Sequence, residues 1–512
     1  MEHLWRVFGR CLAWVSLSVA LTMLLWALAS WWLNDQAMLW AFGISGAVCA
    51  FVGVTLWNFF PPQPGVVLEI THGFVLTIGV WLWLSVWASG PFYGSPLGLS
   101  WGDSLFYAIS GLTTTGLSVL PASFSLGKVL GMWWVFLQWL GGFGLMLSLI
   151  VMVPLLRMGP HAIIPVESSD RTMKTSPKSV TMIQNMMSVY VGLTILVVVL
   201  LRLLGGMSWW ESWTWSMACV STGGITSTSQ AIVARSVPEK WILSAAMIGG
   251  SVTFYWWLGC IQGHFSQMAR DEQVRFAALW LTAIALIIGW QCPHLSWVDT
   301  ITTACTALSG TGFGLGPLAV SIEPILMITT MIGGCSGSAT GGCKLFRIHM
   351  LWRLTAGMIK KTTDARGFYP VMYQGVIISP QDLQVVVTII VCYVVGWSLA
   401  TLLLMMDFRS FDQAWSIASS AISNSGYVYD GWTQDGSQWS GWTKNIVMIT
   451  MLFGRFEGLS LIGAGVVLWR QIKTRLTATG RRGSVLYRFS SAPSSPHATL
   501  IRGTKNGEQD RV

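Results

Sequence analysis

Charged side chains are scarce in this chain. Asp, Glu, Lys and Arg make up 10% of its 512 residues, whereas soluble domains carry about 25%. Hydrophobic residues reach 53%, and the mean hydropathy is +0.59. So few charges cannot cover the surface of a water-soluble globule. The composition therefore excludes that class and predicts a membrane protein that crosses the bilayer several times.

Patterns that hold metal ions or perform catalysis are also missing. The nine cysteines are scattered, and the closest pair, Cys335 and Cys343, lacks the spacing of zinc ligands. Neither a GxSxG motif on a membrane helix nor an HExxH motif occurs. The Gly-rich segment 333–344 is not a phosphate loop, because Leu345 stands where that motif needs Ser or Thr. We therefore expect neither enzymatic activity nor an organic cofactor.

Apolar runs long enough to cross a bilayer, for which about 20 residues suffice, fill most of the chain. Two of them, 11–33 and 38–60, predict an N-terminal hairpin that ends at a Pro-rich break. Four units follow, each with an outward span, a short segment and a returning span. The outward spans are expected at 70–90, 181–204, 274–291 and 383–405. The returning spans are expected at 128–155, 240–266, 323–358 and 444–470. Between them, segments near 102–112, 210–220, 298–307 and 412–422 are too short to cross and predict re-entrant half-helices.

One pattern occurs once in each unit, at 100–116, 208–224, 296–312 and 410–426. Each copy starts with Ser and an aromatic residue and ends with a Gly that follows a hydroxyl residue by three positions. The first three copies carry an acid three positions after the Ser, where the fourth has Gln413 and places Asp412 one step earlier. Ser is a favoured helix N-cap, and an acid suits the positive end of a helix dipole. Four matched copies predict a pseudo-fourfold arrangement around one axis.

The loops that end these copies predict an ion-selective pore. A dehydrated cation needs a ring of oxygens, which backbone carbonyls supply when Gly allows a positive φ. The negative ends of four half-helices would favour a cation at the same axis. Close helix packing is the alternative, but it does not explain a fourfold register. The expected ion-binding residues are Thr113, Thr114, Thr115, Gly116, Ser221, Thr222, Gly223, Gly224, Ser309, Gly310, Thr311, Gly312, Ser423, Asn424, Ser425 and Gly426.

The third returning segment contains a Gly-rich interruption. A continuous helix through it would lose about 1 kcal/mol per Gly relative to Ala, so two half-helices joined by a loop are expected. Such a loop survives at membrane depth only where it lines water or protein. Candidate gating residues are Gly333, Gly334, Ser336, Gly337, Ser338, Thr340, Gly341, Gly342, Lys344 and Arg455. A kinked, tightly packed helix is the alternative for this segment.

Arg455 lies deep in the last span, where a cation is costly and must face the pore or a partner. Glu457 does not share its helix face, so Arg455 is expected to meet the loop or pore water. A structural tie to carbonyls of neighbouring helices is the alternative. The basic residues that continue the third returning segment indicate an inside anchor or a docking surface for a partner. They are Lys344, Arg347, Arg353, Lys360 and Lys361.

Lys and Arg gather in the segments that lie inside when the N-terminus is cytoplasmic, as the positive-inside rule requires. The C-terminus is then cytoplasmic as well. The tail from 473 to 512 is rich in Arg, Ser, Pro and Gly, which predicts disorder. Its cations could contact membrane lipid or a cytoplasmic partner. The sequence gives no sign of nucleic-acid binding.

The set formed by the N-terminal hairpin, the four loops, 333–344 and 451–457 resembles the Trk/Ktr/HKT superfamily of potassium transporters, most closely its bacterial TrkH branch. The resemblance covers about 1–472. It implies K⁺ uptake through a central pore and a homodimer in the bacterial inner membrane. It also implies a gate formed by the intramembrane loop with Arg455, and a cytoplasmic TrkA-like nucleotide-binding regulatory subunit.

Two departures leave an alternative open. The third and fourth loops, Ser-Gly-Thr-Gly and Ser-Asn-Ser-Gly, are looser than the family's usual filters. In plant relatives, Ser at the first filter Gly accompanies sodium permeation, and here all four positions are Gly. K⁺ is therefore the expected ion. The alternatives are a Na⁺-permeable or H⁺- or Na⁺-coupled symporter of the same fold, or an inverted-repeat symporter.

The expected organisation has six parts. They are an N-terminal hairpin (1–65), four pore repeats (66–160, 161–270, 271–370 and 371–472), and the basic tail (473–512).

Overall fold

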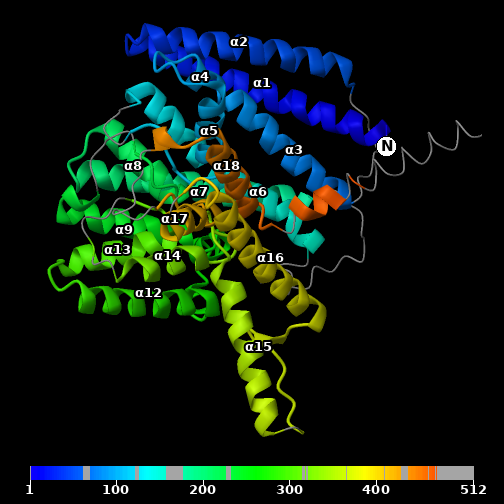
Figure 1. Ribbon diagram of the computed structural model, residues 1–512, viewed down its shortest axis with the longest axis vertical. Coiled ribbons are helices and arrows are strands. Elements are labelled where there is room, and N and C mark those ends of the chain that lie inside the picture. The colour runs from blue at the N-terminus through cyan, green and yellow to red at the C-terminus, as the bar shows by residue number, and fades with distance from the viewer. Residues whose placement is uncertain are drawn as a thin grey trace, which may run out of the picture. The chain divides into compact units, whose positions relative to one another are not determined.

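The computed structural model describes residues 2–61, 70–121, 126–156, 177–226, 232–313, 318, 321–364, 366–408, 410–427, 436–458, 461–466 and 469. Over these ranges the chain is almost entirely helical (Figure 1). Six of the described helices are long and apolar enough to cross a membrane. The number rises to seven if the bent pair α9 (Val237–Ser251) and α10 (Phe254–Ile261) counts as one span. The chain thus has the all-α polytopic fold that its composition predicts.

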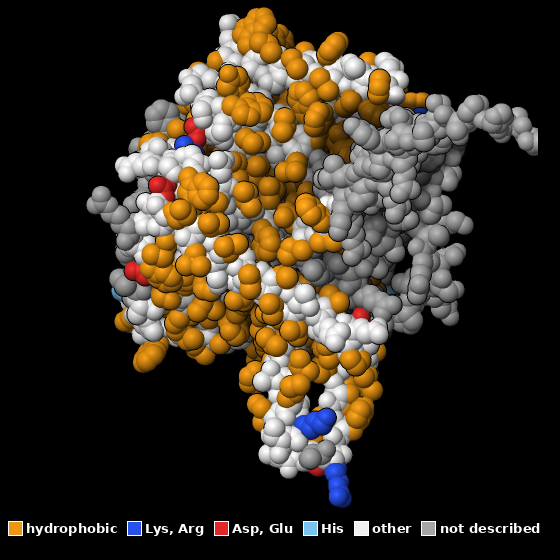
Figure 2. Space-filling model, turned by 45° about the vertical axis from the view of Figure 1, so that its right-hand side comes forward, with side chains coloured by type: hydrophobic (Ala, Val, Ile, Leu, Met, Phe, Trp, Pro, Cys, Tyr) orange, Lys and Arg blue, Asp and Glu red, His pale blue; other side chains and the backbone are white. Residues whose placement is uncertain are grey.

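The first two helices, α1 (Glu2–Trp32) and α2 (Gln36–Phe59), form the expected N-terminal hairpin (Figure 1). Asp35 starts α2, because its carboxylate accepts a 3.2 Å hydrogen bond from the Met38 amide. Large apolar side chains on this hairpin, such as Phe51, remain exposed in the isolated chain. Apolar side chains also cover much of the face seen in Figure 2. Lipid would bury such side chains in a membrane.

Each of the four units has an outward helix, a half-helix and a returning segment (Figure 1). The first comprises α3 (Ile70–Ala88), α4 (Gly90–Tyr93), α5 (Trp101–Leu112) and α6 (Lys128–Leu156). The second comprises α7 (Pro177–Leu203), α8 (Trp209–Ser221), α9 and α10, with α11 (Phe265–Met268) after it. The third comprises α12 (Glu272–Gln291), α13 (Trp297–Ser309), α14 (Glu323–Ile332) and α15 (Leu345–Thr363). The fourth comprises α16 (Pro380–Leu404), α17 (Phe411–Ser423) and α18 (Gly441–Arg455).

The half-helices α5, α8, α13 and α17 start at the predicted Ser residues. Ser100, Ser208 and Ser296 each accept a hydrogen bond from the backbone of the acid three positions later. Ser410 precedes α17 in the same place but makes no side-chain cap bond. The fourth copy has Gln413 where the others carry the acid, with Asp412 one position earlier, and it is also the one whose cap is incomplete.

The third returning segment is interrupted, as the sequence predicts. α14 ends at Ile332 and α15 begins at Leu345, with an irregular loop between them. Gly333, Gly337 and Gly342 have positive φ, which a continuous helix of L-residues does not accommodate.

The second returning segment is also broken, which corrects the continuous span expected at 240–266. α9 and α10 meet at an angle of 104° around Val252 and Thr253. Thr253 caps the new helix by accepting a 3.2 Å hydrogen bond from Trp256 N. The fourth returning helix is likewise shorter than expected, because α18 ends at Arg455 and positive φ values follow at Glu457 and Gly458.

A small β-hairpin separates the third and fourth units. Its strands β1 (Met372–Tyr373) and β2 (Val376–Ile377) pair antiparallel. Gln374 and Gly375 between them both have positive φ, the geometry of a type I′ turn. The expected basic tail at 473–512 lies outside the described residues.

Candidate functional site

The four half-helices end in the same backbone motif. In each, a residue with φ between +53° and +66° follows the end of the helix. These residues are Thr114, Thr222, Gly310 and Asn424. The amide after each one bonds the carbonyl five positions back, as Thr115 N does to Ser110 O at 2.9 Å. The other three bonds join 223 to 218, 311 to 306 and 425 to 420. This is the Schellman motif, and it turns all four loops away from their helices in the same manner.

The four loop Gly residues form a closed ring of contacts. A Cβ on Gly116 would meet the carbonyl oxygen of Gly223, and one on Gly224 would meet that of Thr311. One on Gly312 would meet Ser425 O, and one on Gly426 would meet Thr115 O, which closes the circle. Each Gly therefore lies against the carbonyl just before the Gly of the next unit. All four have positive φ, from +65° to +84°. The units thus surround one axis in the order of the sequence.

Burial along the loops repeats fourfold as well. In every loop the first three residues are buried and the Gly is partly exposed. The ring is therefore open on its Gly side. The third and fourth loops share this geometry despite their different sequences, since Gly310 and Asn424 occupy the positions where Thr114 and Thr222 lie.

Hydroxyl groups stabilise three of the loops from within. Thr113 Oγ1 lies 2.8 Å from Thr115 Oγ1, and Ser309 Oγ lies 2.6 Å from Thr311 Oγ1. Ser423 Oγ donates to Ser425 Oγ at 3.0 Å. The second loop has Gly223 where the other loops have their second hydroxyl residue. Here Gln138 of α6 takes over, because its side-chain amide donates a hydrogen bond to Gly223 O. Gln138 was missed by sequence reasoning. A buried polar residue in an otherwise apolar helix was the available signal.

The Gly-rich loop 333–342 packs beneath this ring. All its residues except Ser336 and Gly337 are buried. Gly341 lies against the carbonyl of Ser423, the first residue of the fourth filter loop. On the other side the loop pairs with the break of the second returning segment. Cys335 N bonds Ser251 O at 2.9 Å, Ala339 N bonds Gly250 O at 3.1 Å, and Phe254 N bonds Gly337 O at 3.3 Å.

Arg455 joins the ring to the loop. It is 1% exposed. Its Nη1 donates to Thr114 Oγ1 at 3.0 Å and to Ala339 O at 3.3 Å, and its Nη2 donates to Gly141 O at 2.8 Å. Both sequence-based interpretations thus hold in part, because Arg455 contacts the loop and a neighbouring helix. Lys344 is also buried, and its Nζ donates to Thr340 O within the loop.

The candidate docking residues divide into two groups. Arg347 is buried and bonds Glu457, an acid whose partner could not be predicted from the sequence. Arg353 pairs with Glu272 at 3.0 Å. Lys360 and Lys361 remain exposed at the end of α15. Lys344 and Arg347 therefore offer no basic surface, which corrects that expectation for two of the five residues. The pair of Arg347 and Glu457 was not predicted, although an acid within the membrane generally requires a cationic partner.

Ion pairs join neighbouring units at the starts of two half-helices. Lys240 of α9 lies 2.6 Å from Asp299 at the start of α13, and Lys444 of α18 lies 2.6 Å from Asp103 at the start of α5. Burial by itself would raise the pKa of both carboxyl groups. The Lys and Ser hydrogen bonds outweigh it, so both pKa values lie below the ordinary range. These acids are therefore charged at neutral pH.

Comparisons with known proteins agree with this architecture. The family model described as TrkH, cation transport protein, matches residues 41–291. The potassium uptake protein TrkI of Halomonas elongata is 27% identical over 84% of this chain and 90% of its own length. TrkG of Escherichia coli is 23% identical over 82% and 90% of the two chains.

The crystal structure of the potassium transporter TrkH from Vibrio parahaemolyticus superposes with a TM-score of 0.81. It is 22% identical, and the match covers 90% of this chain and 98% of that one. Within the described ranges, no group of three or more His, Cys, Asp or Glu residues could hold a metal ion. The chain is thus a multi-pass membrane protein that resembles the TrkH cation transport proteins of the Trk/Ktr/HKT superfamily, which are transporters and not enzymes.

Proposed function

We propose that this chain takes up K⁺ through a pore on the axis of the four loops. The observation that carries the proposal is the closed ring in which each Gly lies against a carbonyl of the next unit. Carbonyls held this closely around one axis suit a dehydrated monovalent cation. The relatives named as potassium uptake proteins support K⁺ as the ion.

The ion-binding groups in this proposal are the carbonyls and hydroxyls of the four filter loops, 113–116, 221–224, 309–312 and 423–426. The C-terminal ends of α5, α8, α13 and α17 turn into these loops, so their negative dipole ends add a favourable potential for a cation. No resident cofactor is required, because K⁺ is the transported substrate.

The gate in this proposal is the loop 333–342 with Lys344 and Arg455. Its packing beneath the ring supports this role, because an ion leaving the filter toward the inside has to pass the loop. Arg455 places a positive charge between the loop and the first filter, which repels a cation at that level.

We propose the bacterial inner membrane as the location, with both termini cytoplasmic. Sorting of Lys and Arg supports this orientation. A homodimer that works with a TrkA-like nucleotide-binding subunit is the proposed assembly. The relatives are named as proteins of a Trk system, which supports a transporter with more than one component.

Ion flux into proteoliposomes that contain the full-length protein tests the function. K⁺, Rb⁺, Na⁺ and Li⁺ are compared under an imposed voltage. Uptake of K⁺ and Rb⁺ well above Na⁺ is expected. Equal uptake of K⁺ and Na⁺ would instead favour the Na⁺-permeable alternative, for which the unusual third and fourth loops are the specific observation. Flux that requires a H⁺ or Na⁺ gradient would favour a coupled symporter.

A further inference from the structure

The Gly-rich loop has one side-chain contact that leads out of the membrane region toward the β-hairpin. The backbone amide of Ser336 donates to Gln273 Oε1 at 3.0 Å. Gln273 lies in the first turn of α12 and is 1% exposed. Asp271 fixes this turn, since its carboxylate accepts from the amides of Gln273 at 2.8 Å and Val274 at 3.2 Å. The contact to the loop therefore starts from a rigid helix end.

The other end of the same amide reaches the β-hairpin. Gln273 Nε2 donates to the Tyr373 hydroxyl at 3.1 Å. Tyr373 is 1% exposed and packs edge-on against Phe346 in the first turn of α15, with ring centroids 5.1 Å apart. One buried amide plane thus connects Tyr373 to Ser336. The bond between Gln273 and Tyr373 is buried, so water cannot replace it without entering this site, whereas the bond to Ser336 is partly buried.

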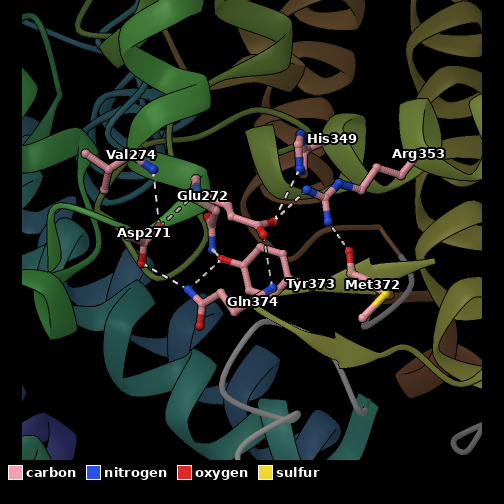
Figure 3. A network of polar contacts seen from close by, with 9 residues as sticks. Asp271, Glu272, Val274, His349, Arg353, Met372, Tyr373 and Gln374 are labelled. Atoms are coloured by element: carbon pink, nitrogen blue, oxygen red, sulfur yellow. Dashed lines mark hydrogen bonds and ion pairs between the residues drawn. The ribbon is translucent and has the colours of Figure 1, made fainter. Parts of the chain in front are cut away.

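Polar contacts fasten the hairpin around this connection (Figure 3). Gln374 N donates to Glu272 Oε1 at 3.3 Å, and Gln374 Nε2 donates to Asp271 Oδ2 at 3.4 Å. Glu272 also pairs with Arg353 of α15, whose guanidinium bonds Met372 O. The hairpin is therefore attached to the starts of both α12 and α15, while Met372, Val376 and Ile377 remain exposed.

We infer that Gln273 is a positioning residue that relays the position of the hairpin to the loop. When Tyr373 moves away, the Gln273 amide loses a partner and reorients, which releases Ser336 N. A perturbation of the hairpin from the cytoplasmic side thereby loosens the loop. The inference rests on the proposed function in one respect, that a loosened loop is a more open gate.

Two substitutions test the relay in full-length protein. Tyr373→Phe keeps the ring against Phe346 but removes the hydroxyl, and Gln273→Leu removes both hydrogen bonds at similar volume. Rb⁺ flux and hydrogen exchange of the peptide containing 335–340 are measured in proteoliposomes. Loss of one buried hydrogen bond shifts a two-state equilibrium about 3- to 10-fold. We expect both readouts to rise by that factor in each variant, with an unchanged K⁺/Na⁺ ratio.

The double variant should equal Gln273→Leu alone in both readouts, because the other hydrogen bond of the hydroxyl, accepted from Gln374 Nε2 at 3.4 Å, does not reach the loop. The matched control is Tyr369→Phe, which removes a hydroxyl bonded at 2.9 Å to Asp364 in the same segment. It should change neither readout. Unchanged exchange in both test variants, or an equal rise in the control, would overturn the relay. Faster exchange with unchanged flux would support the relay but refute the loop as the gate.

Discussion

At the scale of single residues, the four filter Gly positions are not equivalent. A Cβ on Gly116 would lie 2.8 Å from Gly223 O, whereas the other three Gly residues meet the next carbonyl more closely. All four also have a positive φ that costs an L-residue about 1–2 kcal/mol. The first filter is thus the position at which a side chain displaces the ring least.

Gly116→Ser should give a folded protein with weaker discrimination between K⁺ and Na⁺, and Gly312→Ser should be the more damaging change. Displacing one coordinating carbonyl costs on the order of 1 kcal/mol, or about fivefold in selectivity. Ion flux with K⁺ and Na⁺ measures this ratio. Gly98→Ser is the matched control, because Gly98 has φ +65° and open space around it. Unchanged selectivity in both filter variants would refute the carbonyl ring.

At the scale of elements, two broken returning segments meet. The break between α9 and α10 supplies the backbone partners of the loop between α14 and α15. Arg455, at the end of α18, adds a third element to this contact. The loop is therefore held by groups from the second and fourth units, as well as by Gln273 of its own unit.

Shortening 333–342 or replacing Arg455 by Ala should raise basal flux. Arg455→Ala removes the charged donor of two buried hydrogen bonds, to Gly141 O and to Ala339 O, at a cost of about 1–3 kcal/mol each. Rb⁺ flux with expression-matched protein is the measurement. Arg455→Lys separates charge from hydrogen bonding, because Lys keeps the charge but not the bidentate reach. Unchanged flux in both the shortened and the Ala variants would show that the gate is elsewhere.

The buried pair of Arg347 and Glu457 joins the start of α15 to the end of α18. Glu457→Gln should lower stability by about 3 kcal/mol, since it leaves a buried charge without its partner. Adding Arg347→Met should recover most of this loss, because neither charge then remains. Thermal unfolding in detergent compares the variants. Equal stability of the wild type and Glu457→Gln would contradict the pair.

At the scale of the whole pore, two of the four contacts between units carry a Lys–Asp ion pair. These are the contacts between the second and third units and between the fourth and first. The side chains are 9% to 20% exposed, so solvent screens them only in part. The ion pairs therefore follow a pseudo-twofold arrangement, although the ring of loops that they surround is pseudo-fourfold.

Lys444→Met and Lys240→Met should each lower stability by about 1 kcal/mol at neutral pH. Lys128→Met is the control, because Lys128 starts the first returning helix α6 but is exposed. The pKa of both Asp partners is depressed in the folded state, so the stabilisation is present above the ordinary carboxyl pKa. It disappears as the pH falls below about 4. Thermal unfolding at pH 7 and at low pH checks this, and a pH-independent difference would contradict it.

The sequence was sufficient for what depends on local pattern. Apolar runs determine the spans, Ser caps determine where the half-helices start, and the spacing of the Gly residues determines the fourfold register. Each of these signals depends only on residues close together in the sequence. The Gly content of 333–342 likewise predicts a break. The bend at Val252 escaped detection because its residues are compatible with a helix, and only contact with the loop stabilises their irregular backbone.

Partners across the molecule were decided by tertiary structure alone. Glu457 pairs with Arg347, 110 residues away, and Gln138 supports a loop 85 residues away. Nothing local selects such partners, since burial and charge compensation depend on which helices pack together. The sequence by itself determined that four loops would meet at an axis. The packing of the units against one another decided what lies beneath these loops, because it brings the donors and acceptors of the buried carbonyls and amides together.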